Sequence, residues 1–134
     1  MVVDGRERRA GQGNNAFVFP GLGLGAIVAE SREVTDEMLL AAAQALSGAV
    51  SPGRLAEGVL YPPIATLPQL AHRIAVAVAH RAIGSGLGRP MAADEIEPAV
   101  EAASWDPTYR PYVPDQPSVR RGSGNGHAQR GVRS

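Results

Sequence analysis

The sequence contains no cysteine and no lysine, and both absences narrow the chemistry open to it. Without cysteine there is no disulfide framework, no thiolate nucleophile and no cysteine-ligated zinc or iron-sulfur site. All 13 basic residues are arginine, so no lysine can form a Schiff base, act as a general base or hold phosphate in a P-loop. Aromatic residues make up only 4% of the chain, against 44% for hydrophobic residues as a whole. A core of alanine, valine, leucine and isoleucine at close contacts favours helices over sheets.

Long apolar runs and an excess of either charge are also missing. The longest apolar run, at about residues 74–79, is far too short to span a bilayer. The residues after Met1 lack the apolar stretch of a signal peptide. The formal net charge is zero, which gives no electrostatic reason to expect nucleic acid or an anionic membrane as partner. We therefore expect a soluble, cytoplasmic protein that binds neither.

The chain divides into three segments by composition. Residues 1–13 form a polar N-terminal segment, residues 14–114 carry the apolar periodicity, and residues 115–134 are rich in glycine, serine and arginine and are expected to be disordered. Pattern and capping signals predict one short buried strand followed by helices. The expected elements are a strand at 16–19, helices at 21–30, 35–48, 51–58, 68–84 and 94–104, and an aromatic arm at 105–112 that docks on the body.

Two amides, Asn14 and Asn15, stand on a glycine-flanked turn just before the predicted strand. Each amide offers two donors and an acceptor, so the pair can hold a carboxylate or a ribose hydroxyl without adding charge. The simpler alternative is an Asx-type turn, in which a side chain bonds only to its own backbone. Such a pair indicates binding and not, by itself, catalysis.

The glycine-rich segment that follows, Gly21 to Ala26, fits the relaxed dinucleotide fingerprint G-x-G-x-x-A. The context of that motif is missing, because Pro20 ends the strand, a helix follows instead of a second strand, and no acidic strand end lies about 20 residues on. We therefore favour glycines that let another element pack close to the helix backbone. Cofactor-binding residues stay unknown.

Among the histidines and acidic residues, we predict no catalytic group and no metal ligand. His72 and His80 are two turns apart on one predicted helix, too far for joint metal ligation. The acidic residues from Asp94 to Glu101 are explained by a solvated first turn of a helix. The arginines of the tail are sparse and lack interleaved aromatics, so they give little support for nucleic-acid binding.

The segment from Gly11 to Gly25, which contains Gln-Gly-Asn-Asn, resembles the malic enzymes late in their NAD(P)-binding domain. The resemblance continues in order and spacing through Val34–Met38, through the Leu-Tyr-Pro-Pro element and through Trp105–Tyr109. It covers about residues 4–114. The fold class it implies is mainly α with one short strand, as a C-terminal fragment of an α/β Rossmann-type NAD(P)-binding domain.

This resemblance implies oxidative decarboxylation of malate to pyruvate, with reduction of NAD or NADP and a divalent metal, Mg or Mn. In that family the Asn pair after Gln-Gly touches the substrate, which assigns malate binding to Asn14 and Asn15. Residues 14–114 then correspond to part of the NAD(P)-binding domain and the helical region after it.

The family's proton-donating Tyr, Lys base, acidic metal ligands and dinucleotide loop all lie upstream of the matched segment. We therefore expect the isolated chain to lack activity and to bind neither cofactor nor metal tightly. One hypothesis is an enzyme portion that works with the remaining malic enzyme domains or as a homo-oligomer. The alternative is a non-catalytic remnant or helical oligomerisation module built from the helix at 66–84 and the aromatic arm. A strand without neighbours would also promote self-association.

Overall fold

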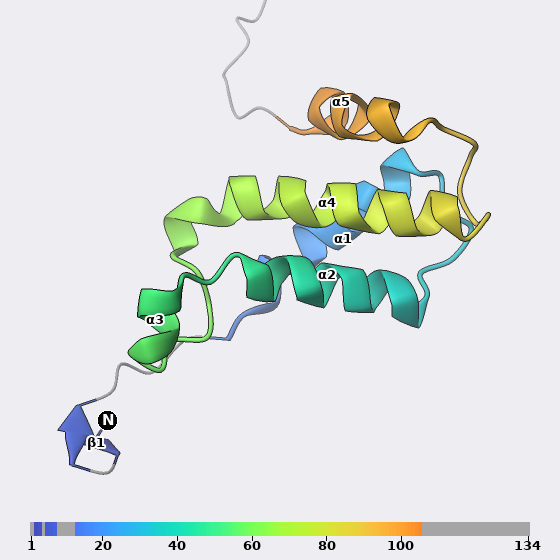
Figure 1. The fold of residues 1–134 in the computed structure, drawn as a ribbon. Coiled ribbons are helices and arrows are strands. Elements are labelled where there is room, and N and C mark those ends of the chain that lie inside the picture. Colours follow the sequence, from blue (N-terminus) through green and yellow to red (C-terminus); the bar gives the residue numbers. More distant parts are fainter. Residues whose placement is uncertain (1, 4, 8–12, 106–134) are drawn as a thin grey trace, which may run out of the picture.

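A layered bundle of helices makes up most of the computed structural model, which describes residues 2–3, 5–7 and 13–105 (Figure 1). Here α marks an α-helix and η a short 3-10 helix. In chain order the elements are β1 (Val2–Val3), β2 (Arg6–Glu7), η1 (Asn15–Phe17), α1 (Phe19–Val28), α2 (Asp36–Gly48), α3 (Pro52–Ala56), η2 (Ile64–Thr66), α4 (Leu67–Gly84) and α5 (Ala93–Ala103). The mainly helical fold predicted from composition is confirmed.

Local side-chain chemistry determines where the helices begin and end. The hydroxyls of Thr35 and Ser51 accept hydrogen bonds from backbone N–H groups three residues on, which caps α2 and α3. Gly58 after α3 and Gly86 after α4 have φ of 79° and 70°, a left-handed conformation that glycine adopts without strain. The predicted caps and the predicted end of α2 at Gly48 are confirmed.

Helix α4 is the centre of the bundle, and α1, α2 and α5 all pack against it. In Figure 1 it runs between α2 and α5, with α1 behind it. On its inner face Leu70, Ile74 and Val78 are buried, and Ile83 is partly buried. Alanines fill the rest of the buried face and let the neighbouring helices come close; they are Ala75, Ala79 and Ala82.

Two of the glycines in α1 lie directly against α4. A Cβ added at Gly21 would lie 2.6 Å from the Ala71 carbonyl oxygen and 2.6 Å from the Ile74 Cβ. A Cβ added at Gly25 would lie 2.5 Å from the Ala75 carbonyl oxygen. No side chain larger than hydrogen fits at either position unless α4 moves. The packing role predicted for these glycines is confirmed.

The strand predicted at residues 16–19 is wrong. Asn15–Phe17 forms η1 and α1 begins at Phe19, so within residues 13–105 no strand is present. The Asn14 side chain accepts a hydrogen bond from the Ala16 backbone N–H, which starts a helical turn where the Phe and Val content had indicated a strand. The strands that do occur in the described ranges, β1 and β2, pair antiparallel through a turn at Gly5 and were not predicted.

The predicted docking of the aromatic arm is wrong at its first residue, because the Trp105 side chain is 85% exposed. The rest of the arm and the segment 115–134 lie outside the described residues. Among the described helices, none combines the length and the apolar character needed to cross a lipid bilayer.

Candidate functional site

The two amides occupy different places in the turn that precedes α1. Asn14 is extended, with φ −141° and ψ 138°, and caps η1. Its Oδ1 accepts from the Ala16 backbone N–H at 2.9 Å. Asn14 therefore forms the Asx-type turn that was the simpler interpretation of the pair. Its side chain is exposed, so the two amide donors still face solvent.

Asn15 is the first residue of η1 and has an exposed side chain. Its backbone carbonyl accepts from the Val18 N–H at 3.0 Å. Within the part of the chain that the structure describes, its side-chain amide has no hydrogen-bond partner. Among the described residues, nothing therefore occupies the donors and acceptor of the Asn15 amide, whereas the Asn14 acceptor is used.

Aromatic packing holds this turn against the body. Phe17 is buried, and its ring lies beside that of Tyr61, with centroids 5.2 Å apart and planes tilted by 31°. Tyr61 belongs to the Leu-Tyr-Pro-Pro element, so two of the segments that carry the family resemblance meet in space. The sequence showed both elements but gave no signal that they touch.

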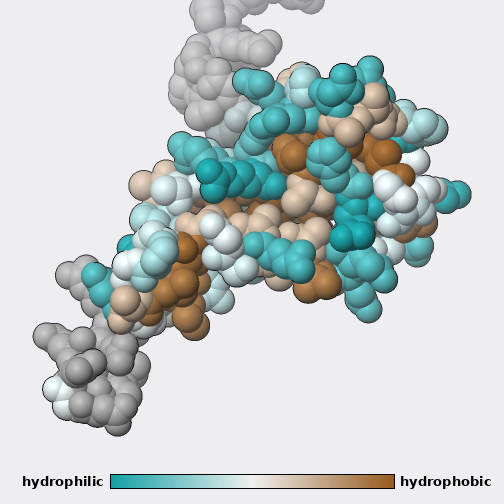
Figure 2. All heavy atoms as spheres, viewed as in Figure 1, coloured by the Kyte–Doolittle hydropathy of each residue, from teal (hydrophilic) through white to brown (hydrophobic). Residues whose placement is uncertain are grey.

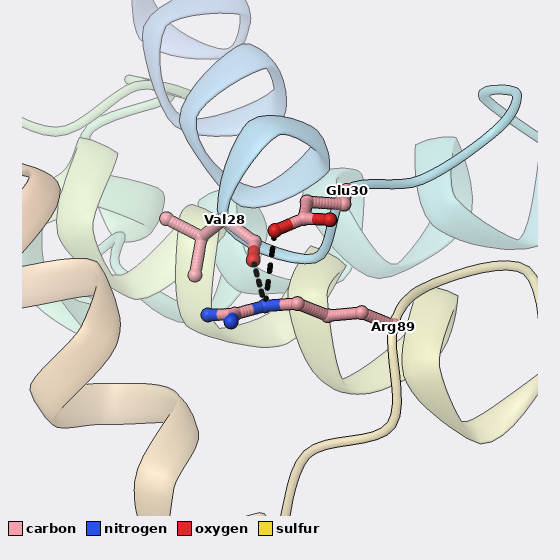
Figure 3. A network of polar contacts seen from close by, with 3 residues as sticks. All are labelled: Val28, Glu30 and Arg89. Atoms are coloured by element: carbon pink, nitrogen blue, oxygen red, sulfur yellow. Dashed lines mark hydrogen bonds and ion pairs between the residues drawn. The ribbon is translucent and has the colours of Figure 1, made fainter.

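The C-terminal end of α1 is closed by Arg89, which comes from the loop before α5 (Figure 3). The Arg89 backbone N–H donates to the Ala29 carbonyl at 2.8 Å, and its Nε donates to the Val28 carbonyl at 3.3 Å. Arg89 Nε also lies 3.6 Å from Glu30 Oε1. These contacts satisfy carbonyls that the helix itself leaves without partners. They serve the fold, and no local pattern in the sequence indicates them.

A cleft of about 450 Å³ lies between α2 and the C-terminal half of α4. Its lining combines alanines with the polar side chains of Gln44, His80 and Arg81, which are exposed. His72, two turns from His80 on α4, does not line this cleft. Among the described residues, no group of three or more His, Asp or Glu side chains could hold a metal.

The sequence of this chain is similar to known proteins. Residues 1–83 match the family described as the NAD binding domain of malic enzyme. The chain is 40% identical over 114 residues to an NADP-dependent malic enzyme 2 from Arabidopsis thaliana, covering 84% of this chain and 19% of that protein. It is 38% identical over 112 residues to an NAD-dependent malic enzyme from Shewanella frigidimarina, covering 84% of this chain and 20% of that protein.

A third relative, an NADP-dependent malic enzyme from Populus trichocarpa, is 39% identical over 113 residues, covering 84% of this chain and 19% of that protein. The chain belongs to the malic enzyme family and corresponds to a portion of its NAD-binding domain. It spans about a fifth of the length of these relatives. The relatives include both NAD- and NADP-dependent proteins, so the family as a whole uses NAD(P).

Proposed function

We propose that this chain is part of a malic enzyme and supplies the turn with Asn14 and Asn15 to the site that binds malate. The reaction is the oxidative decarboxylation of malate to pyruvate with reduction of NAD or NADP. The observation that carries the proposal is the exposed Asn15 amide, free of partners among the described residues, on a turn that matches the family. Neutral amides suit this role, because they orient a carboxylate or hydroxyl beside a metal without competing for the metal.

The described residues do not fit the metal or the dinucleotide that the reaction needs. No three His, Asp or Glu side chains meet within them, and the glycines of the fingerprint-like segment at Gly21 and Gly25 are covered by α4. We therefore assign both groups to parts of the enzyme beyond these residues. The role left to this chain is to bind and orient the substrate.

Partners are proposed on the basis of exposed apolar side chains. Helix α1 has no charged residue, and besides the face against α4 it exposes Phe19 and Ile27, by 60% and 73%. A helix that is apolar on all sides is normally buried. A second group of exposed apolar side chains lies over α3 and the segment after it (Figure 2), where Leu55, Leu60 and Ile64 are exposed. The remaining malic enzyme domains are the proposed cover for both surfaces.

A hybrid enzyme tests this function. The matching segment of the Shewanella frigidimarina enzyme is replaced by this chain, and malate-dependent reduction of NAD is measured with Mn²⁺. We expect turnover in the hybrid and none from the isolated chain. Asn15→Ala should lower kcat/KM for malate by on the order of a hundredfold, because it misplaces the substrate. The matched control is Gln44→Ala, which removes an exposed amide from α2 and should leave turnover unchanged.

Either of two results would contradict the proposal. One is a hybrid whose turnover is the same with Asn15 and with Ala at that position. The other is reduction of cofactor by the isolated chain, which would place catalytic groups in a chain that has no lysine.

A second function, a non-catalytic oligomerisation module, is favoured by the apolar outer face of α1. From the sequence, the oligomerisation surface was expected on the helix at 66–84. In the structure the apolar face of that helix, α4, is covered by α1, α2 and α5, so the outer face of α1 is the surface proposed here. In this case the hybrid would be inactive while the isolated chain self-associates through α1.

A further inference from the structure

Tyr61 lies against both ends of the turn that presents Asn14 and Asn15. On the C-terminal side, its ring packs on Phe17, with centroids 5.2 Å apart. On the N-terminal side, a Cβ added at Gly13 would lie 3.1 Å from the Tyr61 hydroxyl and 3.4 Å from two ring carbons. One aromatic side chain thus contacts the residue before the Asn pair and the second residue after it.

Tyr61 is itself fixed from the other side. The Arg54 Nε, on α3, donates to the Tyr61 carbonyl at 3.0 Å. The two prolines that follow exclude a helix here, and Pro63 is extended, with φ −61° and ψ 141°. The Pro62 side chain is buried, whereas that of Leu60 is exposed. The backbone at Tyr61 is therefore held by α3 and by the proline pair, which are not part of the turn that the ring contacts.

Besides Tyr61, backbone hydrogen bonds hold the turn, from the Phe17 N–H to the Asn14 carbonyl at 3.1 Å and from the Val18 N–H to the Asn15 carbonyl at 3.0 Å. η1 also packs against α1 and α4. The Asn14 side chain makes one hydrogen bond, to the backbone of its own segment, and the Asn15 side chain makes none within the described residues. Both side chains are exposed, so burial does not orient them. Gly13 leaves room for the tyrosine hydroxyl, and its backbone does not have a positive φ. A Cβ at this position would crowd the Tyr61 ring, so the constraint on the residue is one of space and not of backbone conformation.

We infer that Tyr61 is a positioning residue for the substrate amides: its ring, clamped between Gly13 and Phe17, sets where Asn14 and Asn15 stand. The inference rests on the proposed function as far as malate is concerned. The placement of the turn does not depend on that function and can be measured on the chain alone. Tyr61 touches no substrate in this scheme, and its effect is exerted through the turn.

Nuclear magnetic resonance of the full chain, labelled with ¹⁵N, tests the placement. In Tyr61→Ala we expect the backbone and side-chain amide signals of Asn14 and Asn15 to move toward random-coil positions and their heteronuclear NOE to fall. In Tyr61→Phe, which keeps the ring, the NOE should stay at the unmodified value. Leu60→Ala, the neighbouring exposed position, is the matched control and should leave the signals of the turn unchanged.

A double substitution keeps the test decisive if Tyr61→Ala does not fold. Gly13→Ala places a methyl group against the Tyr61 hydroxyl, so the heteronuclear NOE of the Asn14 and Asn15 amides should fall. Adding Tyr61→Phe removes that hydroxyl oxygen and should restore the NOE to the value of Tyr61→Phe alone. An unchanged NOE in Gly13→Ala, or a loss that Tyr61→Phe does not reverse, would overturn the inference.

The effect of Tyr61 on malate binding is measured in the hybrid enzyme. Tyr61→Ala should raise KM for malate by on the order of tenfold to a hundredfold, with KM for NAD unchanged and with recovery in Tyr61→Phe. A parallel loss in both KM values would indicate general damage and count against a positioning role. An inactive hybrid would refute the proposed function, while the resonance experiment on the chain would still decide whether Tyr61 places the Asn pair.

Discussion

At the scale of single residues, Asn14 and Asn15 are adjacent in sequence but differ in what they do in the structure. The Asn14 Oδ1 accepts from the Ala16 N–H and caps η1, whereas the Asn15 amide has no partner among the described residues. The two asparagines thus have different roles: Asn14 stabilises the turn, and Asn15 is exposed on it. The difference can be measured as stability.

We expect Asn14→Ala to lower the free energy of unfolding by about 1 kcal/mol, the usual effect of losing a helix N-cap side chain. Asn15→Ala should leave it unchanged, because the exposed side chain makes no hydrogen bond within residues 13–105. Urea denaturation followed by circular dichroism gives both values. Equal losses from the two substitutions would show that Asn15 also stabilises the turn.

Glu37, in the first turn of α2, gives a prediction about acid. Its own backbone N–H and the Thr35 hydroxyl donate hydrogen bonds that lower the pKa of its carboxyl below the ordinary 4.5, and Arg81 lowers it further. Because the folded pKa is the lower one, this stabilisation is complete above pH 4.5 and is lost as pH falls through the folded value. Glu37→Gln should therefore flatten the decline of the urea midpoint below that pH, and an unchanged decline would contradict the assignment.

At the scale of elements, the contact of α1 with α4 depends on glycines at one face of α1. Gly21 and Gly25 face the α4 backbone, whereas Gly23 lies between them on the opposite, exposed side, where an added Cβ would meet nothing within 4 Å. The three glycines look alike in the sequence. Their surroundings predict opposite effects of the same substitution.

Gly21→Ala and Gly25→Ala should each destabilise the chain by about 1–3 kcal/mol, since the new methyl group forces α1 away from α4. Gly23→Ala, the matched control, should stabilise it by roughly 0.5–1 kcal/mol through its better helix propensity. Thermal and urea unfolding of the three variants tests both signs. Stabilisation by all three substitutions would mean that the two helices are not in close contact.

The elements also show which features could be predicted from the sequence. Caps such as Thr35 and Ser51 act within one helical turn, so their residues alone predict where α2 and α3 begin. The glycines of α1 predicted a close neighbour, but not that it is α4. The strand at 16–19 was wrong because Phe and Val content does not reveal whether a partner strand is present, while a single local bond from Asn14 starts η1.

The candidate site was predictable to a similar degree. Asn14 and Asn15 were found from their residue type, their flanking glycines and the family resemblance. The contacts of Tyr61 with Gly13 and Phe17, on either side of the pair, were not predicted, because they join segments far apart in the sequence. The same holds for Arg89, whose Nε reaches the carbonyl of Val28 from the loop before α5. Such contacts depend on how the helices pack, and no local pattern encodes them.

At the scale of the whole molecule, the outer face of α1 determines how the isolated chain behaves. Phe19 and Ile27 lie on the same side of the helix, eight residues apart, with the bare backbone of Gly23 between them. The chain has a formal net charge of zero, so little electrostatic repulsion opposes association. When the chain is alone in solution, a second copy of it can bury this apolar face.

We therefore expect the weight-average mass of the isolated chain in sedimentation equilibrium to rise with concentration. Ile27→Arg should return it to the mass of one chain, because it places a charge in the apolar face and suits the C-terminal turn of the helix. Leu40→Arg is the matched control: Leu40 on α2 is 58% exposed, comparable to the 73% of Ile27, but lies on another helix, so association should persist. A single-chain mass at every concentration, or equal loss of association in both variants, would show that α1 is not the surface through which copies meet.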